Sequence, residues 1–264
     1  MSSSQRCWLP YEKNYLLENG FSLDNLDQYG DRPVEYIVGR AKFMERDFKV
    51  NSSVLIPRLE TEQLVKLAVA ELKELVETAG KQTIKLADVG TGSGAIGLST
   101  ILELSKKIDL TKHHLELVLS DVSATALNLA KSNYCQLFSA QLKKTAKVSF
   151  IKSDLLTAYP SKIRFDLVIA NLPYIPTARL PVLPKSVRDF EPMIALDGGD
   201  DGLEIIRKLI SQLSSKLKEK GVVLLEVDSQ VSLTRDALRL DDKMRLEILT
   251  DSQNQQRFVK VSLN

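Results

Sequence analysis

Short apolar runs alternate with amphipathic stretches along most of the chain. The apolar runs have the length of buried strands and cover residues 84–89, 115–119, 148–151, 165–170 and 222–227. Between them, apolar residues recur at helical spacing in residues 95–104, 124–138 and 203–217, and the last of these helices is expected to end near Gly221. Residues 244–250 and 257–263 alternate apolar and polar side chains, which is typical of a terminal antiparallel pair. This order of elements predicts an α/β fold with a mostly parallel, doubly wound sheet.

The part of the chain before residue 81 follows a different pattern. Residues 1–30 mix aromatic and polar side chains and predict short helices, whereas residues 39–50 predict a small hairpin or an extended lead-in. Apolar residues at helical spacing predict a helix over 60–79 that stops at Gly80. We therefore expect three parts: 1–30, a reduced N-terminal helical segment; 31–80, a lead-in hairpin and helix; and 81–264, the α/β domain.

The composition narrows the class of protein. Hydrophobic residues make up 44% and charged residues 27%, which is typical of a globular chain and excludes disorder as its main state. No stretch reaches the ~18 consecutive apolar residues of a membrane-spanning helix, and the N-terminus lacks the apolar region of a secretory signal. The only cysteines are Cys7 and Cys135, and no Cys/His cluster has zinc-ligand spacing. We expect a cytoplasmic protein without a metal. The net charge of +2 does not favour direct nucleic-acid binding.

A glycine-rich loop joins the first strand of the α/β domain to its first helix. Alternate glycines let the backbone turn tightly and let a ligand approach, and ligands of open α/β sheets bind at this edge. Residues 92–97 also fit the Gly-x-Gly-x-x-Gly dinucleotide fingerprint, which is weak evidence alone. Two details disfavour a nicotinamide cofactor: Asp121 lies 121 − 94 = 27 residues after the loop instead of ~20, and Asp88 would repel a pyrophosphate. The loop candidates for cofactor binding are Asp88, Gly90, Thr91, Gly92, Ser93 and Gly94.

Two further acids follow the next strands and favour a cationic nucleoside. Asp121 can accept both hydroxyls of a ribose, and Asp154 can bind the amino group of adenine while Leu155 packs on the ring. Each acid alone is also explained as a turn or helix-cap residue. Because Asp88, Asp121 and Asp154 follow successive strands beside the glycine loop, we favour a shared ligand. S-adenosylmethionine carries an ammonium and a sulfonium and no phosphate, so the pattern predicts it as the cofactor.

The loop Asn171-Leu-Pro-Tyr174 follows the fourth strand directly. Pro173 stiffens this loop and favours an extended residue before it. The Asn171 side-chain oxygen and the Leu172 carbonyl can then accept hydrogen bonds from one NH2 group, against which Tyr174 packs. This arrangement suits methylation of a planar nitrogen, either a glutamine amide or a base amino group. The alternative is a simple Asn/Pro turn.

These residues resemble the HemK/PrmC family of protein-glutamine methyltransferases. The similarity runs from about Asp31 to the C-terminus, and its most specific stretches are 54–61 and 189–202; it also includes 32–39, 88–94, 121–127 and 171–174. The resemblance implies a Rossmann-like class I methyltransferase domain with a seven-stranded sheet over 81–264. It implies a class I peptide chain release factor as the protein partner, methylated on the glutamine of its Gly-Gly-Gln motif. It also implies that Asn171 touches the cofactor, and that Asn171, Leu172, Pro173 and Tyr174 form the catalytic loop.

The resemblance also places Phe43, Pro57, Arg58 and Glu60 in the wall of the substrate pocket. Core packing for Phe43 and a helix start for residues 57–60 are the alternatives. The chain departs from the family in three ways: Leu172 and Leu59 each replace a usual proline, and only about thirty residues precede Arg32, where the family has a multi-helix domain. The alternative functions are glutamine methylation of a ribosomal protein, amino methylation of a nucleic-acid base, and a non-catalytic cofactor-binding protein.

Overall fold

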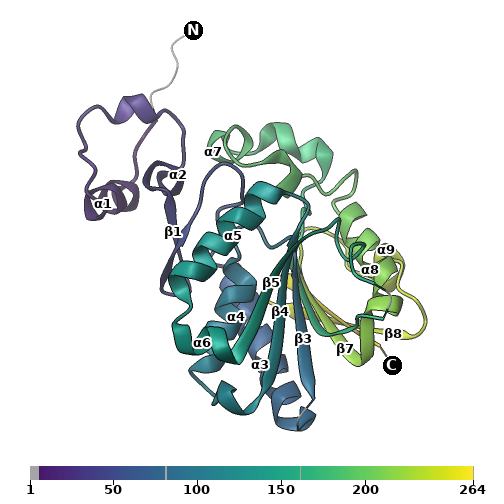
Figure 1. The fold of residues 1–264 in the computed structure, drawn as a ribbon. Coiled ribbons are helices and arrows are strands. Elements are labelled where there is room, and N and C mark those ends of the chain that lie inside the picture. Colours follow the sequence, from purple (N-terminus) through teal and green to yellow (C-terminus); the bar gives the residue numbers. More distant parts are fainter. Residues whose placement is uncertain (1–5, 81, 161, 264) are drawn as a thin grey trace.

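A twisted sheet forms the centre of the molecule (Figure 1). The computed structural model describes residues 6–80, 82–160 and 162–263, and within them the sheet has seven strands in the order β5-β4-β3-β6-β7-β9-β8. β3 to β7 run parallel, and β9 is antiparallel to both β7 and β8. The α/β class, the parallel strands and the terminal antiparallel pair are therefore confirmed. The strands are β3 (Thr83–Val89), β4 (His114–Asp121), β5 (Ala146–Lys152), β6 (Phe165–Asn171), β7 (Leu217–Glu226), β8 (Met244–Thr250) and β9 (Gln256–Leu263).

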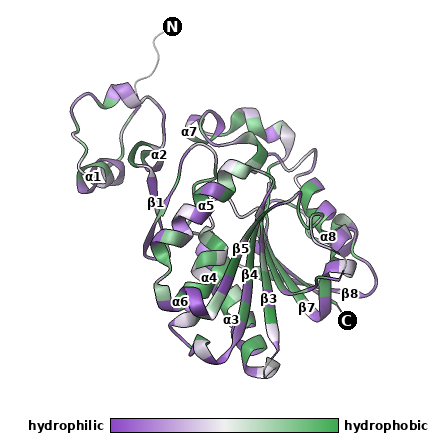
Figure 2. Ribbon diagram, viewed as in Figure 1, coloured by the Kyte–Doolittle hydropathy of each residue, from purple (hydrophilic) through white to green (hydrophobic). Residues whose placement is uncertain are grey.

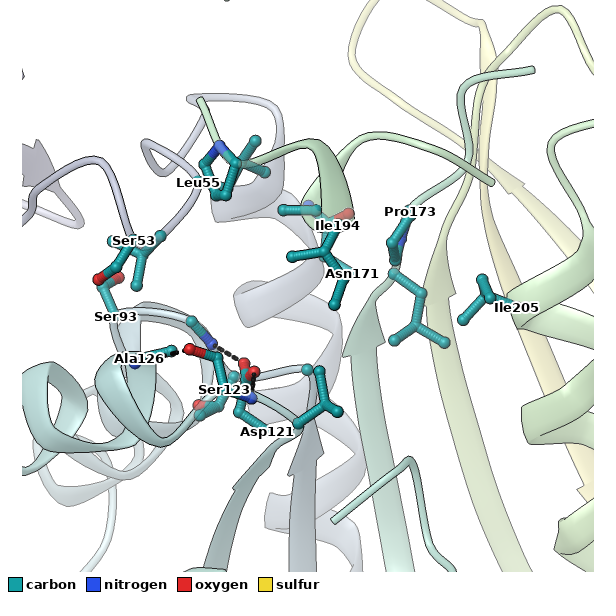
Figure 3. Close-up of a pocket in the computed structure, with 18 of the residues that line it drawn as sticks. Ser53, Leu55, Ser93, Asp121, Ser123, Ala126, Asn171, Pro173, Ile194 and Ile205 are labelled. Carbon is teal, nitrogen blue, oxygen red and sulfur yellow. Dashed lines mark hydrogen bonds between the residues drawn. The ribbon is translucent and has the colours of Figure 1, made fainter. Parts of the chain in front are cut away.

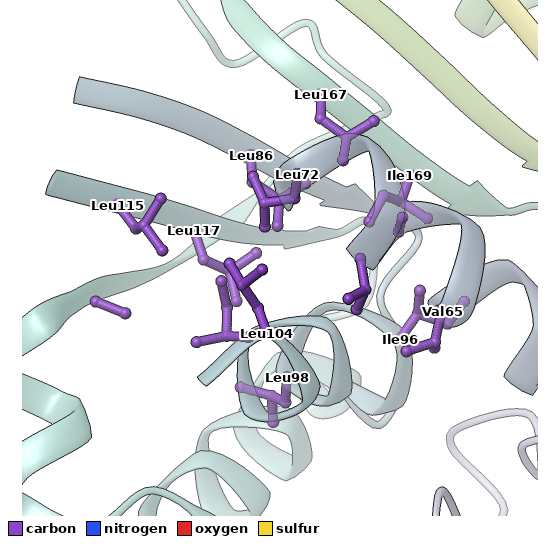
Figure 4. Packing of buried hydrophobic residues seen from close by; sticks show 14 of the residues in the cluster. Val65, Leu72, Leu86, Ile96, Leu98, Leu104, Leu115, Leu117, Leu167 and Ile169 are labelled. Carbon is purple, nitrogen blue, oxygen red and sulfur yellow. The ribbon is translucent and has the colours of Figure 1, made fainter. Parts of the chain in front are cut away.

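Helices cover both faces of the sheet because successive strand residues point to opposite sides. Leu86, Leu167 and Leu224 pack in one core beneath α3 (Thr61–Ala79) and α4 (Ala95–Ser105), as Figure 4 shows for the first two. Their neighbours Ala87 and Val168 belong to the opposite core with α8 (Glu204–Lys216) and α9 (Arg235–Leu238). α5 (Ala124–Leu137) and α6 (Ala140–Thr145) lie along β4 and β5. Hydrophobic residues accordingly concentrate in the sheet, and hydrophilic residues on the outer helix faces (Figure 2).

The remaining helices are short and lie in the connections. The N-terminal helices are α1 (Pro10–Glu18), η1 (Leu26–Tyr29) and α2 (Val34–Val38), and they stand to one side of the sheet in Figure 1. The others are η2 (Leu110–Lys112), η3 (Thr177–Val182), α7 (Lys185–Arg188) and η4 (Met193–Ala195). Short helices are therefore confirmed near the N-terminus for the described residues. In the described part of the chain, no helix is long and apolar enough to cross a membrane.

The predicted hairpin is present as β1 (Arg40–Phe43) and β2 (Arg46–Lys49). Met44 and Glu45 have φ of 49° and 60°, as a tight two-residue hairpin turn requires. The buried Asn133 of α5 fixes the hairpin to the sheet, because its side chain exchanges hydrogen bonds with the Lys49 backbone and donates to the Ser93 carbonyl at 2.8 Å. The hairpin is thereby tied to the glycine loop.

One predicted boundary is wrong. The long helix ends at Lys216 rather than near Gly221, and β7 begins at Leu217. Leu217 pairs with Phe165 and Val222 with Leu167, so β7 advances five residues while β6 advances two. The excess residues form a bulge within β7, in which Lys220 has φ of 64°. Leu217 is apolar at a position that fits either a helix face or a strand, and the pairing with β6 decides between them.

Candidate functional site

The glycine loop and the Asn171 loop meet at the point where the strand order reverses. β3 lies between β4 and β6, and Val89 is paired with Ala170, so the loops after β3 and β6 leave the sheet side by side. Ligands of open α/β sheets bind at such a switch point, outside the carboxyl ends of the strands. A cavity of about 530 Å³ opens there, a size typical of small-molecule sites. Asp121 and Asn171 face this cavity from the two sides (Figure 3).

The glycine loop has the backbone conformation that its sequence predicts. Gly90, Gly92 and Gly94 have φ of 70°, 54° and 81°, a region that residues with a Cβ adopt at a cost. A Cβ at Gly90 would also lie 2.9 Å from Cδ2 of Leu172. Residues 90–93 line the cavity, whereas Gly94, which was also expected to bind the cofactor, precedes α4 and does not line it.

Asp88 does not line the cavity; it lies beneath the loop and is fully buried. Its Oδ2 accepts hydrogen bonds from the Thr91 hydroxyl at 2.6 Å and the Gly97 amide at 2.9 Å. Oδ1 has no hydrogen-bond partner among the described residues, and burial raises the pKa of Asp88 to about 6. This location differs from the expected one at the cavity surface: Asp88 holds the glycine loop from beneath through its bonds to Thr91 and Gly97.

Asp121 ends β4 and lies at the floor of the cavity. Its Oδ2 accepts from the Gly92 amide and its Oδ1 from the Ser123 amide, each at 2.9 Å. These bonds fix the carboxylate, and each oxygen keeps a lone pair for a ligand hydroxyl. Burial raises the pKa of Asp121 above its ordinary value.

Asp154 and Leu155 line the cavity on the β5 side, as expected. The Asp154 side chain is half exposed and pairs with Nζ of Lys208 at 2.5 Å. Leu155 is buried at φ of 52°, an uncommon conformation for a leucine, and this turns its side chain into the apolar part of the site.

Asn171 is the last residue of β6, and its side chain is held from one side only. Its Nδ2 donates to the Thr61 hydroxyl at 3.2 Å, while Oδ1 accepts no hydrogen bond from the described residues. The Leu172 carbonyl likewise accepts none from them. Asn171, Leu172 and Pro173 line the cavity, but Tyr174 does not. The Tyr174 ring packs into the core shared with α8, and its hydroxyl donates to Oε1 of Glu226 at 3.4 Å. Tyr174 therefore supports the loop from behind, which corrects its expected place against the reacting group.

Two of the four expected wall residues are in the wall. Pro57 and Arg58 line the cavity, and Arg58 pairs at 2.5 Å with Glu191, which is buried and does not line it. Phe43 is 1% exposed and packs edge-on against Phe48 in the core, so its expected wall position is wrong and the core-packing alternative is confirmed. Glu60 is exposed, does not line the cavity and precedes the first residue of α3, as the helix-start alternative predicts.

Other lining residues were missed in the sequence. Most of them are apolar or small residues that do not by themselves indicate a binding site. The full set is Ser53, Val54, Leu55, Thr61, Ala95, Ile96, Val122, Ser123, Ala126, Ser153, Pro192, Met193, Ile194, Ala195, Asp197 and Ile205. Many of these residues lie in or beside 54–61 and 189–202, the two most family-specific stretches of the sequence. That both stretches belong to one family pattern was the signal that could have placed them at one site. Among the described residues, no group of His, Cys, Asp or Glu is arranged to hold a metal ion.

The strand order and the position of the site define the class I methyltransferase fold. The family model described as methyltransferase small domain matches residues 67–180. A release factor glutamine methyltransferase of Clostridium acetobutylicum is 36% identical over 233 residues, which are 85% of this chain and 74% of that relative. The chain belongs to the release factor glutamine methyltransferase family.

The comparisons also show how far the likeness extends. The relative from Moorella thermoacetica is 37% identical over 197 residues, which are 75% of this chain and 62% of the relative. The chain thus spans less than two thirds of several relatives that it matches. Solved structures share the fold at low identity. They include the hMettl16 catalytic domain in complex with an RNA hairpin (TM-score 0.56, 16% identity, 82% of this chain and 74% of that one). A human methyltransferase 10 domain containing protein gives a TM-score of 0.52 at 16% identity, over 83% of this chain and 88% of that one.

Proposed function

We propose that this chain transfers a methyl group from S-adenosylmethionine to the side-chain amide nitrogen of a protein glutamine, in the Gly-Gly-Gln motif of a class I peptide chain release factor. The observation that carries the proposal is the pair of acceptors at the cavity. Asn171 Oδ1 and the Leu172 carbonyl are adjacent in the chain, lie beside the glycine loop, and accept no hydrogen bond from the described residues. The family membership and the shared strand order support the same reaction.

The residues around the cavity fit S-adenosylmethionine. Asp121 is held by two backbone amides and keeps lone pairs for ribose hydroxyls. Asp154 and Leu155 offer an acceptor and an apolar surface for a purine, and the Gly90–Ser93 backbone leaves room for the methionyl part. When bound, the cofactor supplies an electrophilic methyl group on a sulfonium. Asp88 is outside this set and keeps the loop in shape from below.

The two acceptors on the Asn171 loop address the weak point of an amide as nucleophile. The lone pair of an amide nitrogen is delocalised into its carbonyl. Acceptors on both N–H bonds raise the electron density at nitrogen and orient it toward the methyl group. Orientation of this kind contributes up to ~7–11 kcal/mol in the best cases. The loop therefore acts by positioning, and the amide proton can leave after the methyl group has arrived.

The surface around the cavity mouth favours a protein segment over a nucleic acid as substrate. Val122, Met193 and Ile194 all line the cavity, yet they are 45%, 47% and 62% exposed. Leu59, next to the wall residue Arg58, is 75% exposed. Exposed apolar side chains in one place indicate a binding surface for another apolar surface. The net charge of +2 adds no attraction for a polyanion.

Incubation with labelled S-adenosylmethionine tests the proposal. Four substrates are compared: a purified release factor, the same factor with the glutamine of its Gly-Gly-Gln motif changed to glutamate, structured RNA, and a ribosomal protein fraction. We expect label only on the release factor that keeps the glutamine, and no label on any substrate with the Asn171→Ala enzyme. Label on RNA, or equal label on both release factors, would contradict the proposal.

A further inference from the structure

A buried acid lies directly behind the Asn171 loop. Glu226 is the last residue of β7 and is paired in register with Asn171 across the sheet. It is 1% exposed and does not line the cavity. Its Oε1 accepts the long hydrogen bond from the Tyr174 hydroxyl at 3.4 Å, and its Oε2 has no hydrogen-bond partner among the described residues. A carboxyl group buried in this way is costly unless a neighbouring donor meets it.

Thr61 stands between this acid and Asn171. It is the first residue of α3 and is 2% exposed. Its oxygen accepts the hydrogen bond from Nδ2 of Asn171. Thr61 also interacts with Glu226: burial raises the pKa of that carboxyl, and the Thr61 hydroxyl and the charge of Arg257 oppose the rise. The hydroxyl rotates freely and has a single proton to donate.

The direction of these bonds follows from the chemistry of the three groups. A carboxylate only accepts hydrogen bonds, so the unpartnered Oε2 of Glu226 is the acceptor available to the one proton of Thr61. The Thr61 oxygen is then left with lone pairs only, and it can be met by the Asn171 NH2 group but not by the Asn171 oxygen. We propose that Glu226 and Thr61 are positioning residues that fix the Asn171 amide with Oδ1 toward the cavity. This inference rests on the proposed function, because a reversed amide would present N–H groups to the N–H groups of the substrate.

Thr61→Val and Thr61→Ser separate the hydroxyl from the methyl group. We expect Thr61→Val to lower kcat/KM about tenfold or more, the size of one lost hydrogen bond in a site, with an unchanged Kd for S-adenosylmethionine. Thr61→Ser keeps the hydroxyl and should restore activity to within about threefold of wild type. The control is Thr100→Val, which removes a buried hydroxyl that bonds only within its own helix, to the Ile96 carbonyl. Equal losses in Thr61→Ser and Thr61→Val would overturn the inference.

Glu226→Gln tests the other end of the chain of hydrogen bonds. A glutamine both donates and accepts, so it no longer dictates where the Thr61 proton points. We expect a loss of activity that does not add to the loss in Thr61→Val, because both changes remove the same constraint. Additive losses would show that Glu226 and Thr61 act independently, and would refute the proposal that together they position Asn171.

A measurement without turnover keeps this inference apart from the proposed function. In 15N-labelled protein, the side-chain NH2 signal of Asn171 is the one that Asn171→Ala removes. We expect slow hydrogen exchange of this group in wild type and faster exchange in Thr61→Val. Slow exchange in a protein that methylates no glutamine would refute the proposed function but support the positioning of Asn171 by Thr61 and Glu226. Equal hydrogen exchange of the Asn171 NH2 group in wild type and Thr61→Val would refute the positioning proposal, whatever the methyl-transfer activity.

Discussion

We expect the charged form of Asp88 to lower the free energy of unfolding at neutral pH. Comparing wild type with Asp88→Asn at two pH values measures the size of this effect. The carboxyl is fully buried and its Oδ1 has no partner among the described residues, although Oδ2 accepts two hydrogen bonds. Burial raises its pKa from 3.8 to about 6. A shift of about two units corresponds to ~3 kcal/mol between the charged and neutral forms.

The sign follows from linkage. Because the folded-state pKa lies above the unfolded one, the stabilisation is present below about pH 4 and is lost as the pH rises through about 6. At pH 5 roughly half of the ~3 kcal/mol remains and almost none remains at pH 7.5, so wild type should lose about 1.4 kcal/mol more than Asp88→Asn between these two pH values. The asparagine also changes hydrogen bonding at every pH, and that constant offset cancels in the difference.

Urea unfolding of both proteins at pH 5.0 and pH 7.5 measures this quantity. The double difference, variant minus wild type and pH 7.5 minus pH 5.0, isolates the titration of residue 88, since other groups are common to both proteins. The exposed Asp200→Asn controls for the loss of one negative charge. A double difference of zero within error for Asp88→Asn would refute the reasoning.

Three further substitutions test the site. Asn171→Ala should lower kcat at least ~100-fold, in line with the loss of substrate positioning, while calorimetry shows nearly unchanged cofactor affinity; unchanged turnover would refute its role. Asp121→Ala should do the reverse and weaken cofactor binding by roughly 1–3 kcal/mol in the same calorimetric titration. Glu191→Gln removes the charge paired with Arg58 and should lower the free energy of unfolding by about 1–3 kcal/mol in urea; an unchanged free energy of unfolding would mean that the pair contributes nothing to stability.

The sequence predicted the sheet and its two loops because those depend on local pattern. Apolar runs of strand length, glycines that need positive φ and a proline-containing turn are visible without any tertiary contact. The helix boundary near Gly221 was wrong because Leu217 suits both a helix face and a strand, and only the pairing with Phe165 decides. The three-part division of the chain stays a prediction.

The three acids show a finer limit of sequence reasoning. Asp88, Asp121 and Asp154 all lie close to strand ends, but strand residues alternate between two faces. Asp121 is the last residue of β4, and its carboxylate reaches the cavity. Asp88 is one residue short of the end of β3, and its side chain points to the start of α4 instead. Spacing along the chain alone does not reveal this difference of one residue. Phe43 likewise lies in the core, in the hairpin that Asn133 of α5 binds through the Lys49 backbone, and no local pattern in the sequence shows this contact.

Leu172 in place of the family proline is the departure that the structure explains best. Its side chain is 4% exposed, and its Cδ2 fills the space that a Cβ on Gly90 would need. The two loops of the site therefore interlock through Leu172, and packing replaces the stiffness of a second proline. Its backbone carbonyl remains free to hold the substrate amide.

Leu172→Ala should consequently affect turnover although it keeps the carbonyl. The cavity left by the missing side chain should cost about 2–5 kcal/mol of stability, and the loosened loop should lower kcat. Leu238→Ala, a fully buried leucine of α9 in the same core, is the matched control and should lose stability with kcat unchanged. Denaturant unfolding and the methyl-transfer assay measure the two effects separately. If Leu172→Ala lost stability while kcat stayed at the wild-type value, the stiffness of the loop would come from Pro173 and the backbone alone.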